Sequence, residues 1–387
     1  MSNLSNSHIM KPFSYPCLQA ILPSLNPNLR THLSASCSEL RTAEQSVPLK
    51  LDHLRFDEAD LSTEINGVSW NVGIFMKYPP GEEIPHMVQD MNERNGLNGD
   101  IDNEGRRDWP TIRSLKPGDL TVQNLPRPYM PDEATEDFTP FIVLRVGDIT
   151  KEIVEYKKNL LDAQRYMNTR LFGNRKGPIL VKRLTVAAKT LRLPEGVQFQ
   201  VKELDLGLVT MEALDNLKPI LAPASFPLDL LRISITRKDF KSHTHPLVRS
   251  ARCIHVLNSE SIGFLPFLTS LRNPTIITNC HLSMLREYIN LVNDWKTNRR
   301  EIGASLTFET YDEESIEQIF TAICGQIECG ENEIGETFVP LTRDTAIKIT
   351  ADEDKGEIAQ ALINDGYGTD YNYLKLEVVQ AEQDVLN

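Results

Sequence analysis

Residues that could bind a metal ion concentrate in one short segment. His243 and His245 are separated by one residue, and Cys253 and His255 follow downstream. On a strand, alternate side chains point to the same side, so the two imidazoles of His243 and His245 could converge on zinc. Pro246 instead favours a loop, on which the rings need not converge. We therefore expect polar loop histidines, and we keep a hydrolase or metal-dependent enzyme built around His243 and His245 as the alternative.

Two other segments resemble ligand-binding loops, but each lacks a residue that the chemistry requires. Asp100–Gly105 begins like a calcium loop, yet the twelfth position is Thr111 instead of the bidentate Glu. Gly173–Gly177 resembles a phosphate loop, yet no Ser or Thr follows a lysine to hold magnesium. The sequence also lacks the usual motifs of serine hydrolases, nucleotide-binding proteins, kinases and zinc peptidases. We predict a polar turn, a helix-to-strand turn, and a protein that has neither catalytic activity nor a cofactor.

Charge is distributed unevenly along the chain, whose formal net charge is -13. Residues 151–252 hold 19 Lys and Arg against 10 Asp and Glu, whereas residues 304–387 hold 4 against 19. The basic middle could attract RNA, but it has few aromatic residues on which bases would stack. Nucleic acid is therefore not an expected partner, and RNA binding remains a further alternative. The acidic end is typical of a solvated surface, or of an interaction surface that folds back on the basic middle.

Length and cysteine content limit the class of protein. A chain of 387 residues is long enough for two to three folded units. Its six cysteines include no C-x-x-C pair, which suits a reducing compartment. No apolar run approaches the roughly 18 residues of a membrane-spanning helix. We expect a cytoplasmic or nuclear protein without a membrane partner.

The first 140 residues divide into three predicted segments. Residues 12–47 have apolar side chains at helical spacing and predict a short helical segment. Residues 48–78 predict a small antiparallel β unit, in which Asn66-Gly67 is a strong hairpin signal. Residues 79–140 are rich in Pro, Gly and Asp and predict a connector with few regular elements.

The remaining chain predicts alternating strands and helices. Phe141–Val146 has the pattern of a buried strand, and residues 149–171 have an amphipathic pattern that predicts a helix. Strands are then expected at 181–186, 201–206, 230–235, 253–257 and 275–279. Equivalent positions recur at 20 to 29 residues when Leu184, Leu204, Ile233, Ile254 and Ile277 are aligned. We predict that residues 141–310 form an irregular leucine-rich-like α/β repeat, or else a compact α/β domain, and that 311–387 form an acidic α/β extension. The fold class is thus mixed α and β.

Several phrases of the sequence resemble a known family. Pro12–Leu18, continued by Leu22, Leu25 and Leu40-Arg41, looks like the F-box-like start of the nematode F-box-associated families. Residues 47–51, 65–74, 293–295 and 300–303 are similar to the nematode-expanded domain of unknown function found in such chains. The resemblance extends from about residue 12 to residue 310.

The resemblance implies a substrate receptor of a cullin ubiquitin ligase. In such receptors the F-box docks a Skp-type adaptor, and the carboxyl-terminal region binds an unknown protein target. An apolar helical face would be buried against the adaptor; the residues predicted to bind this partner are Phe13, Leu18, Ile21, Leu22 and Leu25. Because Pro48 arrives early for a full F-box, the alternative is that residues 12–47 simply pack on the β unit behind them.

Overall fold

A computed structural model describes most of the chain and divides it into two compact units. The described residues are 15–57, 61–101, 107–108, 115–122, 138–157, 160–208, 211–235, 244–258, 265–279, 285–310, 313–327, 329, 335–352 and 372–380. Unit 1 comprises residues 1–121, 126–201 and 219–222, and unit 2 comprises 122–125, 202–218 and 223–387. Five predicted segments thus group into two units, which we describe separately.

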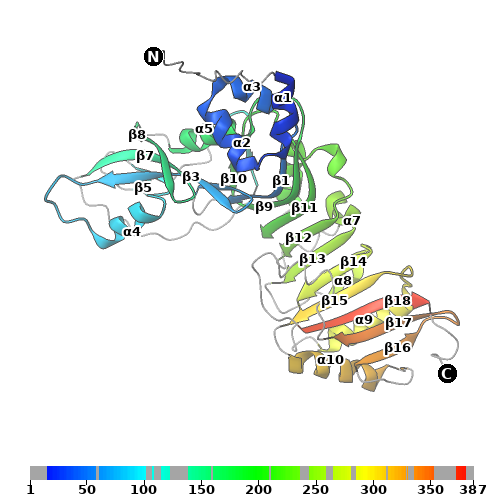
Figure 1. Ribbon diagram of the computed structural model, residues 1–387. Helices are drawn as coiled ribbons and strands as arrows, with labels where there is room; N and C mark the ends of the chain where they lie inside the picture. The colour runs from blue at the N-terminus through cyan, green and yellow to red at the C-terminus, as the bar shows by residue number, and fades with distance from the viewer. Residues whose placement is uncertain are drawn as a thin grey trace, which may run out of the picture. The chain divides into compact units, whose positions relative to one another are not determined.

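Unit 1 begins with short helices, as the apolar spacing predicts. They are α1 (Tyr15–Ile21), η1 (Leu22–Ser24), α2 (Pro27–Ser36) and α3 (Ser38–Ser46), drawn in blue in Figure 1. The Asn26 side chain caps α2 by accepting a hydrogen bond from the Asn28 backbone N–H at 2.8 Å. Pro27 occupies the first turn of α2, where the missing N–H costs nothing. Helix α2 therefore begins where local sequence signals place it.

A mixed sheet forms the body of unit 1. Its strand order is β9-β1-β2-β3-β7-β8, and every neighbouring pair is antiparallel except β1 with β9. The strands are β1 (Lys50–Asp57), β2 (Ser62–Ile65), β3 (Val68–Lys77), β7 (Thr139–Val146), β8 (Ile149–Glu155) and β9 (Ile179–Ala187). Asn66 and Gly67 join β2 to β3 with φ of 49° and 80°, the left-handed conformation of a tight hairpin turn. The predicted hairpin is confirmed.

The helix predicted over residues 149–171 is wrong in its first part. Residues Ile149–Glu155 form strand β8, which pairs with β7, and only α5 (Leu160–Phe172) is helical. Ile149, Thr150, Ile153 and Val154 are β-branched, which favours a strand over a helix. Gly147 adopts φ 57° in the turn that brings β8 back along β7. A hairpin therefore overrides the helical spacing of the isoleucines.

The connector at 79–140 holds few regular elements in its described part. They are α4 (His86–Arg94) and the short strands β4 (Asp100–Ile101), β5 (Arg107–Asp108) and β6 (Asp119–Thr121), of which β6 pairs with β10 (Thr190–Arg192). Arg145 of β7 donates to the backbone carbonyls of Asn92 and Glu93 at the end of α4. Asp119 receives hydrogen bonds from Arg165 and Arg192. Side-chain bonds thus fix the connector to the sheet. Most of the calcium-like segment lies outside the described residues.

Unit 2 is built on parallel strands that follow one another in chain order. β11 (Phe199–Leu208) begins in unit 1 and continues in unit 2, followed by β12 (Leu230–Ile235), β13 (Cys253–Asn258), β14 (Thr275–Asn279) and β15 (Ser305–Thr310). The strands lie side by side in Figure 1. Antiparallel strands then extend the sheet, namely β18 (Asn372–Gln380), β17 (Thr345–Asp352) and β16 (Glu336–Pro340). The predicted strands of this region are confirmed, and the acidic extension contributes to the sheet.

Helices connect the strands of unit 2. They are α6 (Met211–Leu217), η3 (Lys218–Ile220), η4 (Pro223–Ser225), α7 (Pro246–Ser250), α8 (Leu265–Ser270), α9 (Leu285–Thr297) and α10 (Glu313–Gln326). The last two residues of η3, Pro219 and Ile220, belong to unit 1. One row of core residues across the sheet consists of Leu204, Leu231, Ile254, Ile276 and Leu306. Successive members are 27, 23, 22 and 30 residues apart. The predicted alignment is therefore wrong at Ile233 and Ile277, because strand pairing and not spacing sets the register.

Candidate functional site

The residues predicted to bind a partner do not form one exposed face. Leu22 is only 3% exposed and forms a small core with Ala43 and Val47. Leu18 and Leu25 are partly buried against the same core. Ile21 is 43% exposed, and Phe13 lies outside the described residues. Of the four described positions, only Ile21 is exposed.

Three exposed apolar side chains mark the outer surface of the helical segment. Ile21 is joined by Tyr15 and Leu29, which are exposed to a similar extent. The Tyr15 hydroxyl donates a hydrogen bond to the Ser46 Oγ at 3.1 Å, which holds α1 against the end of α3. The helices thus keep apolar surface in contact with water while their inner faces pack together.

A buried charge cluster attaches the helices to the rest of unit 1. Glu44 of α3 accepts hydrogen bonds from Arg30 of α2 at 2.9 Å and from Arg175, after α5, at 2.8 Å. The side chain of Glu44 is 2% exposed, and both arginines are also buried. Burial lowers the pKa of Arg30, and the neighbouring Glu44 carboxylate opposes that shift. The helical segment is therefore an integral part of unit 1, as the packing alternative expects.

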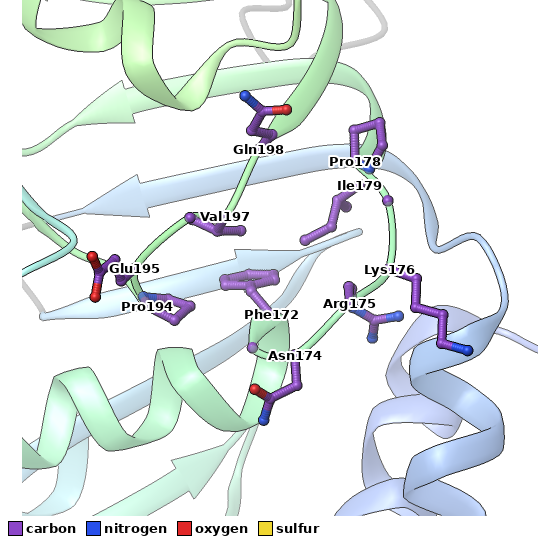
Figure 2. Close-up of a pocket in the computed structure, with 13 residues that line it drawn as sticks. Phe172, Asn174, Arg175, Lys176, Pro178, Ile179, Pro194, Glu195, Val197 and Gln198 are labelled. Carbon is purple, nitrogen blue, oxygen red and sulfur yellow. The ribbon is translucent and has the colours of Figure 1, made fainter.

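The segment that resembles a phosphate loop is a helix-to-strand turn. It joins α5 to β9 and borders a cavity of about 340 Å³ together with residues 194–198. Figure 2 shows that Phe172, Ile179 and Val197 converge there, whereas Asn174 and Lys176 point away. Arg175 binds Glu44 with one of its guanidinium nitrogens. The predicted structural turn is confirmed.

His245 has a structural role in unit 2. It precedes α7, and its Nδ1 accepts a hydrogen bond from the Leu247 backbone N–H at 3.2 Å. The proton of the neutral ring is therefore on Nε2, which lies 3.3 Å from the Asp215 carboxylate. His243 is outside the described residues, and no group of three or more potential metal ligands is found in the part of the chain that the structure describes. His245 thus caps a helix in this structure.

A row of charged side chains crosses the parallel strands of unit 2. Asp205, Arg232 and His255 occupy directly opposite positions on β11, β12 and β13. Arg232 donates through Nη1 to the Asp205 carboxylate at 3.2 Å and through Nε to His255 Nδ1 at 3.2 Å. Arg232 and His255 are buried. The strand register therefore assembles a hydrogen-bonded row.

Glu309 of β15 extends this row beyond β14. Its carboxylate lies 3.2 Å from His255 Nε2, although the angle does not meet hydrogen-bond geometry. Because an Arg Nε–H can only donate, His255 Nδ1 must be the acceptor and the ring proton must lie on Nε2, toward Glu309. We refer to Asp205, Arg232, His255 and Glu309 as the charged row.

The charged row does not supply an activated nucleophile. Cys253 is two residues before His255 on the same strand, but burial and the nearby Glu309 carboxylate raise the pKa of its thiol to about 12. A reactive cysteine needs the opposite shift. His255 Nδ1 is already occupied by Arg232, so it cannot take a proton from a substrate as a base would. The row is better suited to recognising a charged or polar group than to nucleophilic chemistry.

The charged row lies on the sheet face opposite the apolar row. Positions that face the helices, such as Ile254 and Leu306, are almost fully buried. On the other face, Thr307 of β15 lies opposite Ile277 of β14 and Lys375 of β18, and both Thr307 and Lys375 are half-buried. One face of the sheet thus packs on helices, and the other combines buried residues, namely Arg232, His255, Ile277 and Glu309, with half-buried polar residues.

Sequence reasoning identified His255 only as part of a metal-capable cluster and missed its neighbours. Asp205, Arg232 and His255 each adjoin a core position of the strand, namely Leu204, Leu231 and Ile254. Charge placed next to a buried position on three consecutive strands is a signal that could have revealed the row. It becomes visible only when the strands are aligned in their true register.

Comparisons with known proteins identify one matching region. Residues 159–312, less than half of the chain, match the family model described as a domain of unknown function (DUF3557). The charged row falls entirely within the matched region. No curated protein and no solved structure matches the chain. No described helix is long and apolar enough to cross a membrane. The chain thus contains a region similar to this domain family.

Proposed function

We propose that this chain is a non-catalytic protein-interaction protein, and that the face of unit 2 that carries the charged row binds a segment of a protein target. The observation that carries the proposal is the contrast between the two faces of one sheet. Helices cover the apolar face, whereas half-buried polar side chains surround the charged row on the other. An interface needs such a rim of polar groups with directional hydrogen-bonding capacity.

The order of the strands supports this reading. β11 to β15 are parallel neighbours in chain order, which is how stacked repeat units create a continuous surface. In this proposal, β11 to β15 belong to a leucine-rich-like α/β repeat whose units differ in length, and the sheet face that carries the charged row is its binding surface. Half-buried residues such as Thr307 and Lys375 would contact the target directly, and Arg232 would orient its charged neighbours.

A matched pair of substitutions tests this assignment. Thr307→Arg places a long charged side chain on the polar face, and Thr297→Arg places the same side chain at the exposed end of α9. Proteins captured from an extract by the tagged chain are quantified for both variants. We expect bound target to fall at least tenfold for Thr307→Arg and to remain unchanged for Thr297→Arg. Equal capture by two folded variants would contradict the assignment of this face.

The finer form of the proposal is a substrate receptor of a cullin ubiquitin ligase, in which the helical segment binds a Skp-type adaptor. It is supported by the three exposed apolar side chains Tyr15, Ile21 and Leu29, because adaptor binding needs apolar surface available for burial. Leu22 packs inside the segment, so it would shape this surface from beneath. The segment would dock as part of unit 1, to which the Glu44 cluster attaches it.

Adaptor binding is tested with a charge on the exposed surface. Ile21→Asp removes an exposed apolar side chain, whereas Ser24→Asp adds the same charge at an exposed polar position nearby. Both variants are mixed with a purified Skp-type adaptor and analysed by size-exclusion chromatography. A complex formed by the intact chain and Ser24→Asp but lost in Ile21→Asp is the expected result. Absence of a complex with the intact, folded chain would remove the ubiquitin-ligase role and leave the target-binding role untouched.

A further inference from the structure

Strand β8 is an exposed edge of the sheet in unit 1. It is the last strand in the order of that sheet and pairs only with β7 among the described strands. All seven of its residues are exposed, and Ile149 and Ile153 are 60% and 62% exposed. An edge strand offers a row of backbone N–H and C=O groups to an added strand. Large apolar side chains on such an edge are unusual, because they favour association.

The charges on β8 determine which additional strand can pair with it. The strand reads Ile-Thr-Lys-Glu-Ile-Val-Glu, with Lys151, Glu152 and Glu155 as its charged residues. Lys151 has no partner on β7, because the pairing shifts by one residue between Leu144 and Arg145. Glu155 lies 4.0 Å from Lys157, and both are highly exposed, so this ion pair is weak. Lys151 and Glu155 can therefore take partners on another chain.

Antiparallel pairing of β8 with a second copy of itself has few possible registers. A two-fold axis perpendicular to the sheet must pass through a residue that faces its own copy. Registers centred on Lys151, Glu152 or Glu155 place identical charges directly opposite each other, which is destabilising. Registers centred on Thr150 and Val154 also bring like charges together, since Asp148 then faces Glu152 and Lys151 faces Lys157 respectively. None of these five arrangements is self-complementary, and a register centred on Ile149 would place Lys151 opposite Gly147 of the preceding turn, leaving most of β8 without a strand to pair with.

The register centred on Ile153 is self-complementary. Ile153 faces its copy, and Lys151 of each strand lies opposite Glu155 of the other. Glu152 then lies opposite Val154, so no like charges meet directly. The arrangement buries an exposed isoleucine pair and forms two symmetric ion pairs.

We propose that two copies of this chain associate by antiparallel pairing of their β8 strands, with the two-fold axis at Ile153. The interface is isologous, since the same surface serves both copies. Because it is one strand wide, the dimer is weak and its population depends on protein concentration. This association is independent of the target-binding and adaptor-binding roles proposed above.

Charge reversal tests both the dimer and its register. The full-length chain is studied by sedimentation velocity across a concentration series, at low and high salt. The dimer has two positions at which Lys151 of one copy faces Glu155 of the other. Lys151→Glu converts both into pairs of glutamates, and Glu155→Lys converts both into pairs of lysines. Each single variant is expected to weaken the dimer at least tenfold, since each reverses two cross-strand pairs. The double variant with both substitutions restores the opposite charges and is expected to dimerise like the intact chain.

Mixing the two single variants provides the sharpest readout. Lys151→Glu and Glu155→Lys chains are each monomeric alone but are expected to form a heterodimer, because all charges across that pairing are opposite. Lys157→Glu is the control, since in this register residue 157 lies opposite Ile149. An intact chain that stays monomeric throughout the concentration series overturns the proposal, as does a dimer that neither single variant weakens. If β8 instead pairs with a strand of a different protein, the purified chain alone would stay monomeric.

Discussion

The Glu44 cluster of unit 1 and the charged row of unit 2 are both clusters of buried charges, and they differ in what surrounds them. In unit 1, Glu44 lies between two buried arginines and joins helices to the segment that follows α5. In unit 2, the charged row joins neighbouring strands that backbone hydrogen bonds already hold together. The same sheet face also carries the half-buried residues Thr307 and Lys375. The first cluster therefore attaches separate elements to each other, whereas the second joins strands that are already paired.

The energetics of buried ions explain why this difference matters. An ion pair buried in a protein contributes little net stability, because desolvation offsets the attraction between the charges. Removal of one partner is nevertheless costly, because the remaining charge is left buried. Variants that remove one charge therefore report how completely each cluster is shielded from water. The following substitutions compare the two clusters on this basis.

The largest effect is expected for Glu44→Ala. The substitution leaves Arg30 and Arg175 facing each other without a carboxylate in a buried site, so the free energy of unfolding should fall by about 3–5 kcal/mol. Equilibrium urea unfolding measures this change. Glu39→Ala, at an exposed position of the same helix, is the control and should change stability by less than about 0.5 kcal/mol. Similar values for the two variants would mean that the cluster does not attach the helices.

A smaller effect is expected for Arg232→Met in unit 2. Methionine fills similar space, Asp205 retains access to water, and His255 Nδ1 loses its donor. The expected cost in unfolding free energy is about 1–3 kcal/mol, as for a buried polar atom without its hydrogen bond. Arg252→Met removes a charge from the exposed pair with Asp229 and should be nearly neutral. A loss for Arg232→Met as large as that for Glu44→Ala would erase the distinction between the clusters.

The two units also differ in how far the sequence predicts them. The strands of unit 2 could be predicted because each is a short apolar run bounded by turn residues. Their register could not, because Ile233 and Ile277 have the same character as the true equivalents Leu231 and Ile276. In unit 1, β8 was mistaken for a helix because Ile149 and Ile153 are four residues apart, a spacing that also suits a helix. Both the register of unit 2 and the strand conformation of β8 are decided by the neighbouring strands with which they pair, and the local sequence gives no information about those neighbours.

The candidate site was predictable only in its residue types. Glu44, Arg30 and Arg175 are distant in sequence, and nothing local indicates that they meet. The apolar spacing of the first helices is real, but it cannot show that Leu22 points inward and Ile21 outward. His255 was noticed as a possible ligand, whereas Asp205 and Glu309, which make it part of a row, lie 50 and 54 residues away. Contacts between residues that are distant in sequence therefore decide which residues form the site, and the local sequence does not reveal these contacts.

The smallest expected effect concerns His245, a buried ionisable group of unit 2 whose pKa is lowered by its surroundings. Burial lowers its pKa, with a further lowering by Lys218, while Asp215 opposes the shift. The unfolded chain therefore takes up a proton near the ordinary pKa of 6.5, and the folded chain does so only at lower pH. Between those two values the unfolded state binds more protons, so stability decreases as pH falls from about 6.5.

Urea unfolding between pH 7.5 and 5 measures this dependence, which cannot exceed about 1.4 kcal/mol per pH unit for one group. His245→Asn keeps a capping oxygen before α7 but cannot titrate, so its stability should change less with pH than that of the intact chain. His32→Asn, at an exposed position of α2, should follow the intact chain. If His245→Asn also follows the intact chain, His245 is not held neutral by its surroundings. The pH dependence of stability would then arise from other titratable groups, and the comparison of the units would rest on the Glu44 cluster and the charged row.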